Sequence, residues 1–314
     1  MRQEEELEEE PTFLYNKEQI TIESISTVFN KSVKSRNDKY NKTRENIIGS
    51  IINNKVPYDF YKNAYWCELR DGIISFLTTL SPEHVIKVEC LHKGGRGNNY
   101  DFTFVLHYVN GIVIEKQIEF KYGTVSIDKA PQFVSPMNPS KYLISQCSYE
   151  EYVYDNYLPI LSEKSGFTIP IKEEYLKEIH SPSPPCMEKF QRLYYQGCKQ
   201  SSKYTGTEEA IGFYELCKKM SKESIQNCIN VSDLNIELLS NYLYDTQKKK
   251  VYMLYSNKKF ILQNVDMDNY KLISSTKNTA KQRYECISEN GEKINVLLRW
   301  KNGHCVAYPA FQIS

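Results

Sequence analysis

The stretch that decides the fold reads DFTFVLHYVNGIVIEKQIEFK, residues 101–121. Apolar residues occupy every second position over 102–108 and, with Lys116 as the one exception, over 112–120, and both series fall on even numbers. Successive side chains of a strand point to opposite faces, so each segment is predicted to be a strand with an even-numbered core face. Asn110-Gly111 between them is a turn sequence, which predicts a hairpin.

The length of the loop decides which residues of this hairpin face each other. A two-residue turn would pair Val109 with Ile112 and would put the two apolar series on different faces. A three-residue loop over 109–111 pairs Tyr108 with Ile112 and keeps one core face, with Gly111 supplying the left-handed residue that such loops use. We therefore expect the three-residue loop.

This register places Asp101 directly across from Glu119, with their Cβ atoms about 5 Å apart. Lys121 lies on the same face, one pleat further along the strand. Two opposed carboxylates destabilise a hairpin unless a cation neutralises them, and Mg²⁺ is bound in proteins by one or two such groups. An ammonium beside such a metal can orient a water or stabilise developing negative charge.

Asp101, with Glu119-Phe120-Lys121 on the partner strand, resembles the motif of the PD-(D/E)xK nuclease superfamily, the restriction-endonuclease-like fold. Glu119-Phe120-Lys121 is the only Glu-x-Lys triplet of the chain, and it has no Asp-x-Lys. The chain departs from the family at Tyr100, where a proline is common.

The family core consists of a helix, three antiparallel strands, a second helix and a further strand. A helix predicted over 60–80, a strand over 85–91 and the hairpin of 101–121 follow that order. The resemblance therefore implies an α/β (α+β) fold, with a mixed sheet flanked by helices.

Carried over to this chain, the family's site implies that Asp101 and Glu119 bind Mg²⁺, or Mn²⁺ as a substitute. The backbone carbonyl of Phe120 would assist, and Lys121 would position the attacking water. Glu68, on the helix of 60–80, is the candidate for the glutamate that completes the site. The simpler alternatives are surface charges at a strand edge and a solvated helix glutamate at position 68.

Several further residues are candidates for contact with nucleic acid. Each also has a plain structural interpretation: a flexible glycine-rich loop, solvated charges, or a tryptophan that covers the edge of a β core. The candidates are Arg96, Lys129, Gln132, Arg299, Trp300 and Lys301.

Composition limits the remaining alternatives. With 314 residues, 40% of them hydrophobic, the chain can build a core, and no apolar run approaches the roughly 18 residues that span a bilayer. Residues 1–10 carry Arg2 and six glutamates, a net charge of −5. The nine cysteines include no Cys-x-x-Cys pair, which favours reduced thiols. We expect an intracellular protein, in the cytoplasm or nucleus and not secreted.

These patterns predict four regions along the chain: an acidic disordered tail over 1–14, a nuclease core over 15–165, a mainly helical region over 166–245, and a basic, β-rich region over 246–314. The expected activity is that of a metal-dependent phosphodiesterase, an endonuclease acting on double-stranded DNA. RNA as substrate stays open, and a homodimer would allow both strands to be cut. The alternatives are an inactive nucleic-acid-binding or assembly protein with the same fold, and a protein-interaction module.

Overall fold

The computed structural model describes residues 10–29, 37–93, 98–127, 132–133, 138–181, 183–264 and 266–313. The chain divides into two compact units. Unit 1 consists of residues 1–95, 100–130 and 249–265, and unit 2 of residues 96–99, 131–248 and 266–314.

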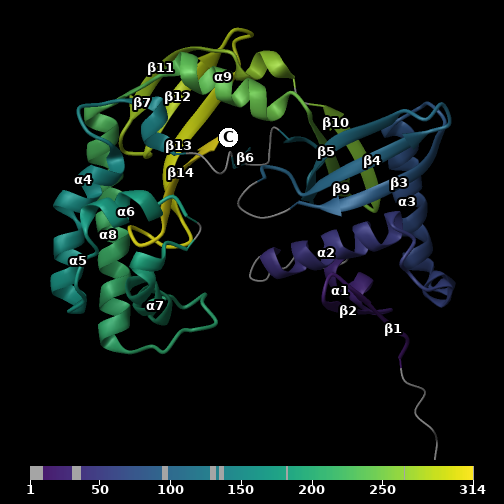
Figure 1. Ribbon diagram of the computed structural model, residues 1–314, viewed down its shortest axis with the longest axis horizontal. Helices are drawn as coiled ribbons and strands as arrows, with labels where there is room; N and C mark the ends of the chain where they lie inside the picture. The colour runs from purple at the N-terminus through teal and green to yellow at the C-terminus, as the bar shows by residue number, and fades with distance from the viewer. Residues whose placement is uncertain are drawn as a thin grey trace, which may run out of the picture. The chain divides into compact units, whose positions relative to one another are not determined.

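Unit 1 contains a five-stranded mixed sheet in the order β10-β9-β5-β4-β3 (Figure 1). Its strands are β3 (Val85–His92), β4 (Phe102–Tyr108), β5 (Val113–Tyr122), β9 (Lys250–Ser256) and β10 (Lys259–Asn264). Strands β5 and β9 run parallel, and the other neighbours run antiparallel.

The rest of unit 1 is helical apart from one small hairpin. Its elements are β1 (Thr12–Tyr15), β2 (Glu18–Thr21), α1 (Ser24–Phe29), α2 (Asn37–Ile52), the 3-10 helix η2 (Tyr58–Lys62) and α3 (Ala64–Leu80). Side chains of all three α-helices share one hydrophobic core with the sheet. The helices therefore cover the face of the sheet that carries the even-numbered residues of β4.

The hairpin has the predicted register. Phe102 lies opposite Ile118, and the Tyr108 N–H donates to the Ile112 carbonyl at 2.9 Å. Gly111 has φ 80°, the left-handed conformation expected of it. The even-numbered residues of β4 are buried as predicted, but Ile112 beside the loop is 53% exposed, so the core covers less of the second strand than its pattern suggests.

Two boundaries in unit 1 differ from the predicted ones. The helix predicted from residue 60 begins at Ala64, because the side chain of Asn63 caps it by accepting from the Tyr65 N–H at 2.9 Å. Residues 12–14, predicted to belong to a disordered tail, lie in β1. The tail's residues 1–9 lie outside the described residues.

Unit 2 combines helices with a five-stranded antiparallel sheet in the order β11-β12-β13-β14-β6. The strands of this sheet are β6 (Gln132–Phe133), β11 (Leu272–Asn278), β12 (Arg283–Ser288), β13 (Lys293–Lys301) and β14 (Tyr308–Ile313). Strands β7 (Leu143–Ile144) and β8 (Asp233–Leu234) pair in a separate two-stranded sheet. Its α-helices are α4 (Tyr149–Asn156), α5 (Leu158–Ser165), α6 (Lys172–Glu178), α7 (Glu188–Gly197), α8 (Glu208–Val231) and α9 (Ile236–Gln247). Its 3-10 helices are η4 (Pro139–Tyr142), η5 (Pro185–Met187) and η6 (Met267–Tyr270).

The mixed α/β fold, the helical middle of the chain and its β-rich C-terminal region agree with the sequence. The division into units differs from the expected one. Residues 131–165, expected in the core, belong to unit 2, and β9 and β10, expected in the C-terminal region, belong to unit 1. The chain leaves unit 1 after β5 and returns to it at β9, because these two strands pair.

None of the described helices combines the length and the apolar character needed to cross a membrane.

Candidate functional site

The open end of the β4–β5 hairpin gathers the predicted acidic residues. The Asp101 N–H donates to the Ile118 carbonyl at 2.9 Å, and the Phe120 N–H donates to Asp101 Oδ2 at 2.8 Å. The Asp101 carboxylate thus accepts a bond that a strand carbonyl would otherwise take. Because the N–H and C=O of a strand residue point to the same side, the Phe120 carbonyl also faces the Asp101 side of β5.

Glu119 is held by two lysines, one on each carboxylate oxygen. Lys121 Nζ lies 2.5 Å from Oε1, and Lys250 Nζ lies 3.2 Å from Oε2. Lys250 is the first residue of β9 and is brought here by the parallel pairing of β9 with β5. Sequence analysis did not single out Lys250, since it lies more than a hundred residues from the motif.

The pKa values of the two acids move in opposite directions. Burial and the charge of Glu119 raise the pKa of Asp101 to about 7, against the opposing effect of the Phe120 N–H. Burial would also raise the pKa of Glu119, but the ammonium groups of Lys250 and Lys121 outweigh it and hold that pKa below its usual value. Glu119 is therefore the ionised member of the pair, whereas the Asp101 carboxyl is about half protonated near neutral pH.

Glu45 of α2 is the third acid of this cluster. Burial, followed by the charges of Asp101 and Glu119, raises the pKa of Glu45 to about 8. A carboxyl that responds to both residues lies in the same electrostatic environment. No pattern in the sequence singled out Glu45, which two buried residues, Ile47 and Ile48, follow on the same helix.

Glu68, predicted to complete the site, is placed elsewhere. Its carboxylate pairs with Lys258 Nζ at 3.0 Å, and its side chain is 53% exposed. Lys258 lies in the turn between β9 and β10, and Tyr65 of α3 packs under its ammonium at 4.8 Å. Glu45, and not Glu68, is thus the helix glutamate whose pKa responds to the charges of Asp101 and Glu119.

Of the residues predicted to contact nucleic acid, the structure describes the side chains of Arg299, Trp300 and Lys301. Arg96 and Lys129 lie outside the described residues, and Gln132 is described only through its backbone pairing with Ile313.

The basic segment on β13 divides between two faces. Arg299 is exposed, and its guanidinium donates to the side-chain oxygen of Gln312. Lys301 lies on the same face of the strand. Trp300 is only 6% exposed, and its Nε1–H donates to the Tyr149 hydroxyl at 2.8 Å. Trp300 therefore packs in the core of unit 2, in line with the plain structural interpretation of this tryptophan and not with a contact to nucleic acid.

The acids of the cluster supply oxygen ligands of the kind that Mg²⁺ prefers. Among the described residues, however, no three His, Cys, Asp or Glu side chains are close enough together to hold a metal ion. Both Glu119 oxygens are engaged by lysines. The donor chemistry fits a divalent cation, and binding one requires Lys121, the more exposed of the two lysines, to release Oε1.

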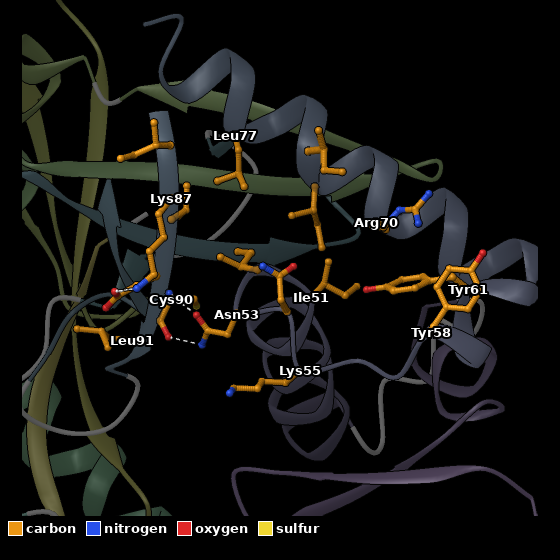
Figure 2. Close-up of a pocket in the computed structure, with 17 residues that line it drawn as sticks. Ile51, Asn53, Lys55, Tyr58, Tyr61, Arg70, Leu77, Lys87, Cys90 and Leu91 are labelled. Carbon is orange, nitrogen blue, oxygen red and sulfur yellow. Dashed lines mark hydrogen bonds and ion pairs between the residues drawn. The ribbon is translucent and has the colours of Figure 1, made fainter. Parts of the chain in front are cut away.

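A separate groove of about 780 Å³ lies between the end of α2, helix α3 and strand β3, the edge of the sheet (Figure 2). Asn53 covers part of that edge. Its amide donates to the Cys90 carbonyl at 2.9 Å and accepts from the Cys90 N–H at 2.8 Å, as a neighbouring strand would. Asp101, Glu119 and Lys121 do not line the groove as described, so it is distinct from the acidic cluster.

We found no match to the chain among protein-family models, curated proteins or solved structures.

Proposed function

We propose that this protein is a Mg²⁺-dependent nuclease that hydrolyses phosphodiester bonds in double-stranded DNA. The observation that carries the proposal is the convergence of Asp101, Glu119 and Lys121 at one end of a hairpin. Lys121 contacts Glu119 directly, and Asp101 bonds to the backbone between them.

The topology of unit 1 supports the proposal. Strands β3, β4 and β5 are antiparallel, and β9 joins β5 in parallel, which is the strand order that the PD-(D/E)xK resemblance implies. Between β5 and β9, where that family has a simple helical crossover, this chain has a long segment that includes residues 131–248 of unit 2. The restriction-endonuclease-like core therefore stays part of the proposal.

A cation of Mg²⁺ type would be held by the carboxyl groups of Asp101, Glu119 and Glu45, which would have to draw closer together than they lie among the described residues. Burial raises the pKa values of Asp101 and Glu45 first, and repulsion from the neighbouring carboxylates adds to it, so a cation bound beside them would lower both pKa values. The Phe120 carbonyl lies on the Asp101 side of β5 and would add a fourth oxygen. In this proposal Glu45 takes the role that the resemblance gave to Glu68.

The reaction is the attack of water on phosphorus. One P–O bond forms, the bond to the leaving sugar oxygen breaks, and that oxygen takes up a proton. Bound Mg²⁺ would supply Lewis acidity, which favours ionised water and stabilises charge on the phosphate. Lys121 orients the water or stabilises the developing negative charge, because its ammonium is 25% exposed and lies beside the acids.

A second candidate function is a nucleic-acid-binding or assembly protein that keeps this fold without activity. The observation in its favour is that lysines engage both oxygens of Glu119, so that the cluster is satisfied without a metal. Calorimetry with Mn²⁺ separates the two functions, because only the nuclease requires binding that depends on Asp101.

The decisive experiment incubates plasmid, linear duplex, single-stranded DNA and RNA with Mg²⁺ or Mn²⁺. Wild type is compared with Lys121→Ala and with Lys116→Ala, which removes a lysine elsewhere on β5. We expect metal-dependent cleavage that Lys121→Ala abolishes and Lys116→Ala retains. Undiminished cleavage by Lys121→Ala, with its fold intact, would remove the mechanism.

A further inference from the structure

Lys250 is the residue of the acidic cluster whose role the proposed chemistry leaves open. It pairs with Gln117 in the parallel register of β9 and β5, so its side chain lies on the same face of the sheet as Glu119. Its Nζ lies 3.2 Å from Glu119 Oε2, and its side chain is 1% exposed. The ring of Tyr252, the residue opposite Glu119, lies 5.6 Å from the same ammonium.

The two lysines on Glu119 differ in what they can do. Lys121 is 25% exposed, so its ammonium can leave Glu119 and still be solvated or contact a phosphate. The Lys250 ammonium has no such freedom, because a buried charge that moves away from its partner loses the pairing that offsets its desolvation. Lys250 is therefore the fixed cation of the pair, and Lys121 is the movable one.

Glu119 itself needs a cation at all times. With only Lys121 as its partner, each departure of that ammonium would leave a largely buried carboxylate uncompensated, which is costly. With Lys250 on Oε2, one oxygen stays paired while the other is open to Lys121 or to a metal. The presence of the second lysine thus lowers the free energy needed to release the first.

We propose that Lys250 is a positioning residue of this site: it keeps Glu119 paired and in place, and so frees Lys121 to act on the water and the phosphate. The inference rests on the proposed nuclease function, and Lys250 is not itself expected to touch the substrate. The other charged groups that face Glu119 are Lys121, Asp101 and Glu45.

The test compares Lys250→Met with Lys249→Met, which removes an exposed lysine at the neighbouring position. The first readout needs neither metal nor substrate: the rate at which acetic anhydride modifies Lys121 in the metal-free protein, followed by mass spectrometry. In Lys250→Met we expect this rate to fall by about threefold or more, because Lys121 becomes the only cation on Glu119. A merely structural role predicts the opposite, since a loosened fold exposes Lys121.

The second readout is cleavage. We expect Lys250→Met to lower the single-turnover rate by about ten- to a hundredfold and to change the Kd for DNA, measured with Ca²⁺, by less than about threefold. Lys249→Met should match wild type in both readouts. Unchanged or faster modification of Lys121 in Lys250→Met overturns the inference, and so does an unchanged cleavage rate.

If Lys250→Met does not fold, the double variant K250M/E119Q decides the matter. It should fold, because neither buried charge then remains without its partner. A double variant that also fails to fold overturns the inference. If wild type cleaves no nucleic acid but modification of Lys121 still slows in Lys250→Met, the nuclease proposal fails while the pairing role of Lys250 stands.

Discussion

The carboxylate of Asp101 accepts a hydrogen bond of 2.8 Å from the backbone N–H of Phe120. This bond joins the two strands of the hairpin where their main-chain ladder ends, and it fixes Asp101 beside Glu119. The arrangement has an energetic cost, because two carboxyl groups are held close together in a partly buried place. The lysines on Glu119 offset part of that cost, while burial, followed by repulsion from the neighbouring acids, raises the pKa values of Asp101 and Glu45.

Asp101→Asn is expected to stabilise the metal-free protein at alkaline pH. The pKa of Asp101 rises from 3.8 to about 7 on folding, so the folded state binds the extra proton and wild type loses stability as pH rises between these values. Asparagine keeps an oxygen for the Phe120 N–H and carries no charge. We expect the variant to be more stable than wild type by up to about 4 kcal/mol at pH 8, with the difference vanishing near pH 4.

Urea unfolding of both proteins over pH 4–8, without metal, measures this difference. If the free energies of unfolding of the two proteins change with pH in parallel, the charge of Asp101 does not destabilise the folded protein. Adding Mg²⁺ at pH 8 should stabilise wild type and leave the variant nearly unchanged.

Glu45→Gln is expected to weaken metal binding, with Glu68→Gln as the matched control on the other helix. Loss of the third carboxyl should lower the affinity for Mn²⁺ about tenfold at pH 8, whereas Glu68→Gln removes only an exposed pair with Lys258. Calorimetry measures both affinities. If Glu68→Gln proves the more damaging variant, the assignment of Glu45 to the site is wrong.

Metal binding by wild type should weaken as pH falls below about 8. The protons on Glu45 and Asp101, whose pKa values are about 8 and about 7, must leave before these carboxyls can bind a cation. The affinity of Glu45→Gln for Mn²⁺ should depend less steeply on pH, because one competing proton is absent. Calorimetry in buffers of different ionisation enthalpy counts the protons released, and no release at pH 6.5 would contradict this account.

Asn53→Ala is expected to destabilise unit 1. The side chain of Asn53 satisfies both backbone groups of Cys90 at the edge of the sheet, and alanine would leave them without that partner (Figure 2). We expect a loss of about 1–3 kcal/mol in urea unfolding, with Lys55→Ala, an exposed substitution nearby, as the control. Equal stability of the two variants would mean that water replaces the asparagine at no cost.

Trp300→Phe is expected to affect the stability of the fold and not the binding of DNA. Phenylalanine cannot donate to the buried Tyr149 hydroxyl, which Trp300 contacts at 2.8 Å, so we expect a loss of about 1–2 kcal/mol. Affinity for duplex DNA, measured by fluorescence anisotropy, should stay within about twofold of wild type. A large loss of affinity in a fully folded variant would restore the stacking role that the sequence suggested.

Local patterns predicted the part of the site that two neighbouring strands build. The alternation over 102–108 and 112–120, together with Gly111, predicted the register that faces Asp101 toward Glu119. Only one loop length kept the apolar residues on one face, so the register that ends with Phe102 opposite Ile118, just before Asp101 and Glu119, followed from sequence spacing alone.

The charge partners of those acids could not be found in the same way. Glu45 lies on a helix more than fifty residues before Asp101. Lys250 lies on a strand that pairs with β5, but residues 131–248 of unit 2 separate the two strands in the sequence. Glu68 and Trp300 are the converse case: the sequence proposed them for the site, and the structure places them elsewhere. Each has the residue type that a site needs, yet Glu68 pairs with Lys258 and Trp300 packs on Tyr149.

By itself the sequence determined the hairpin, its core face and the meeting of Asp101, Glu119 and Lys121, because a strand repeats every two residues and a short loop leaves one register. Only the tertiary structure decided which helix glutamate responds to their charges, and that Lys250 pairs with the second oxygen of Glu119. Those choices depend on which distant elements bury their apolar faces together, and burial is a property of the packed chain that no local spacing encodes.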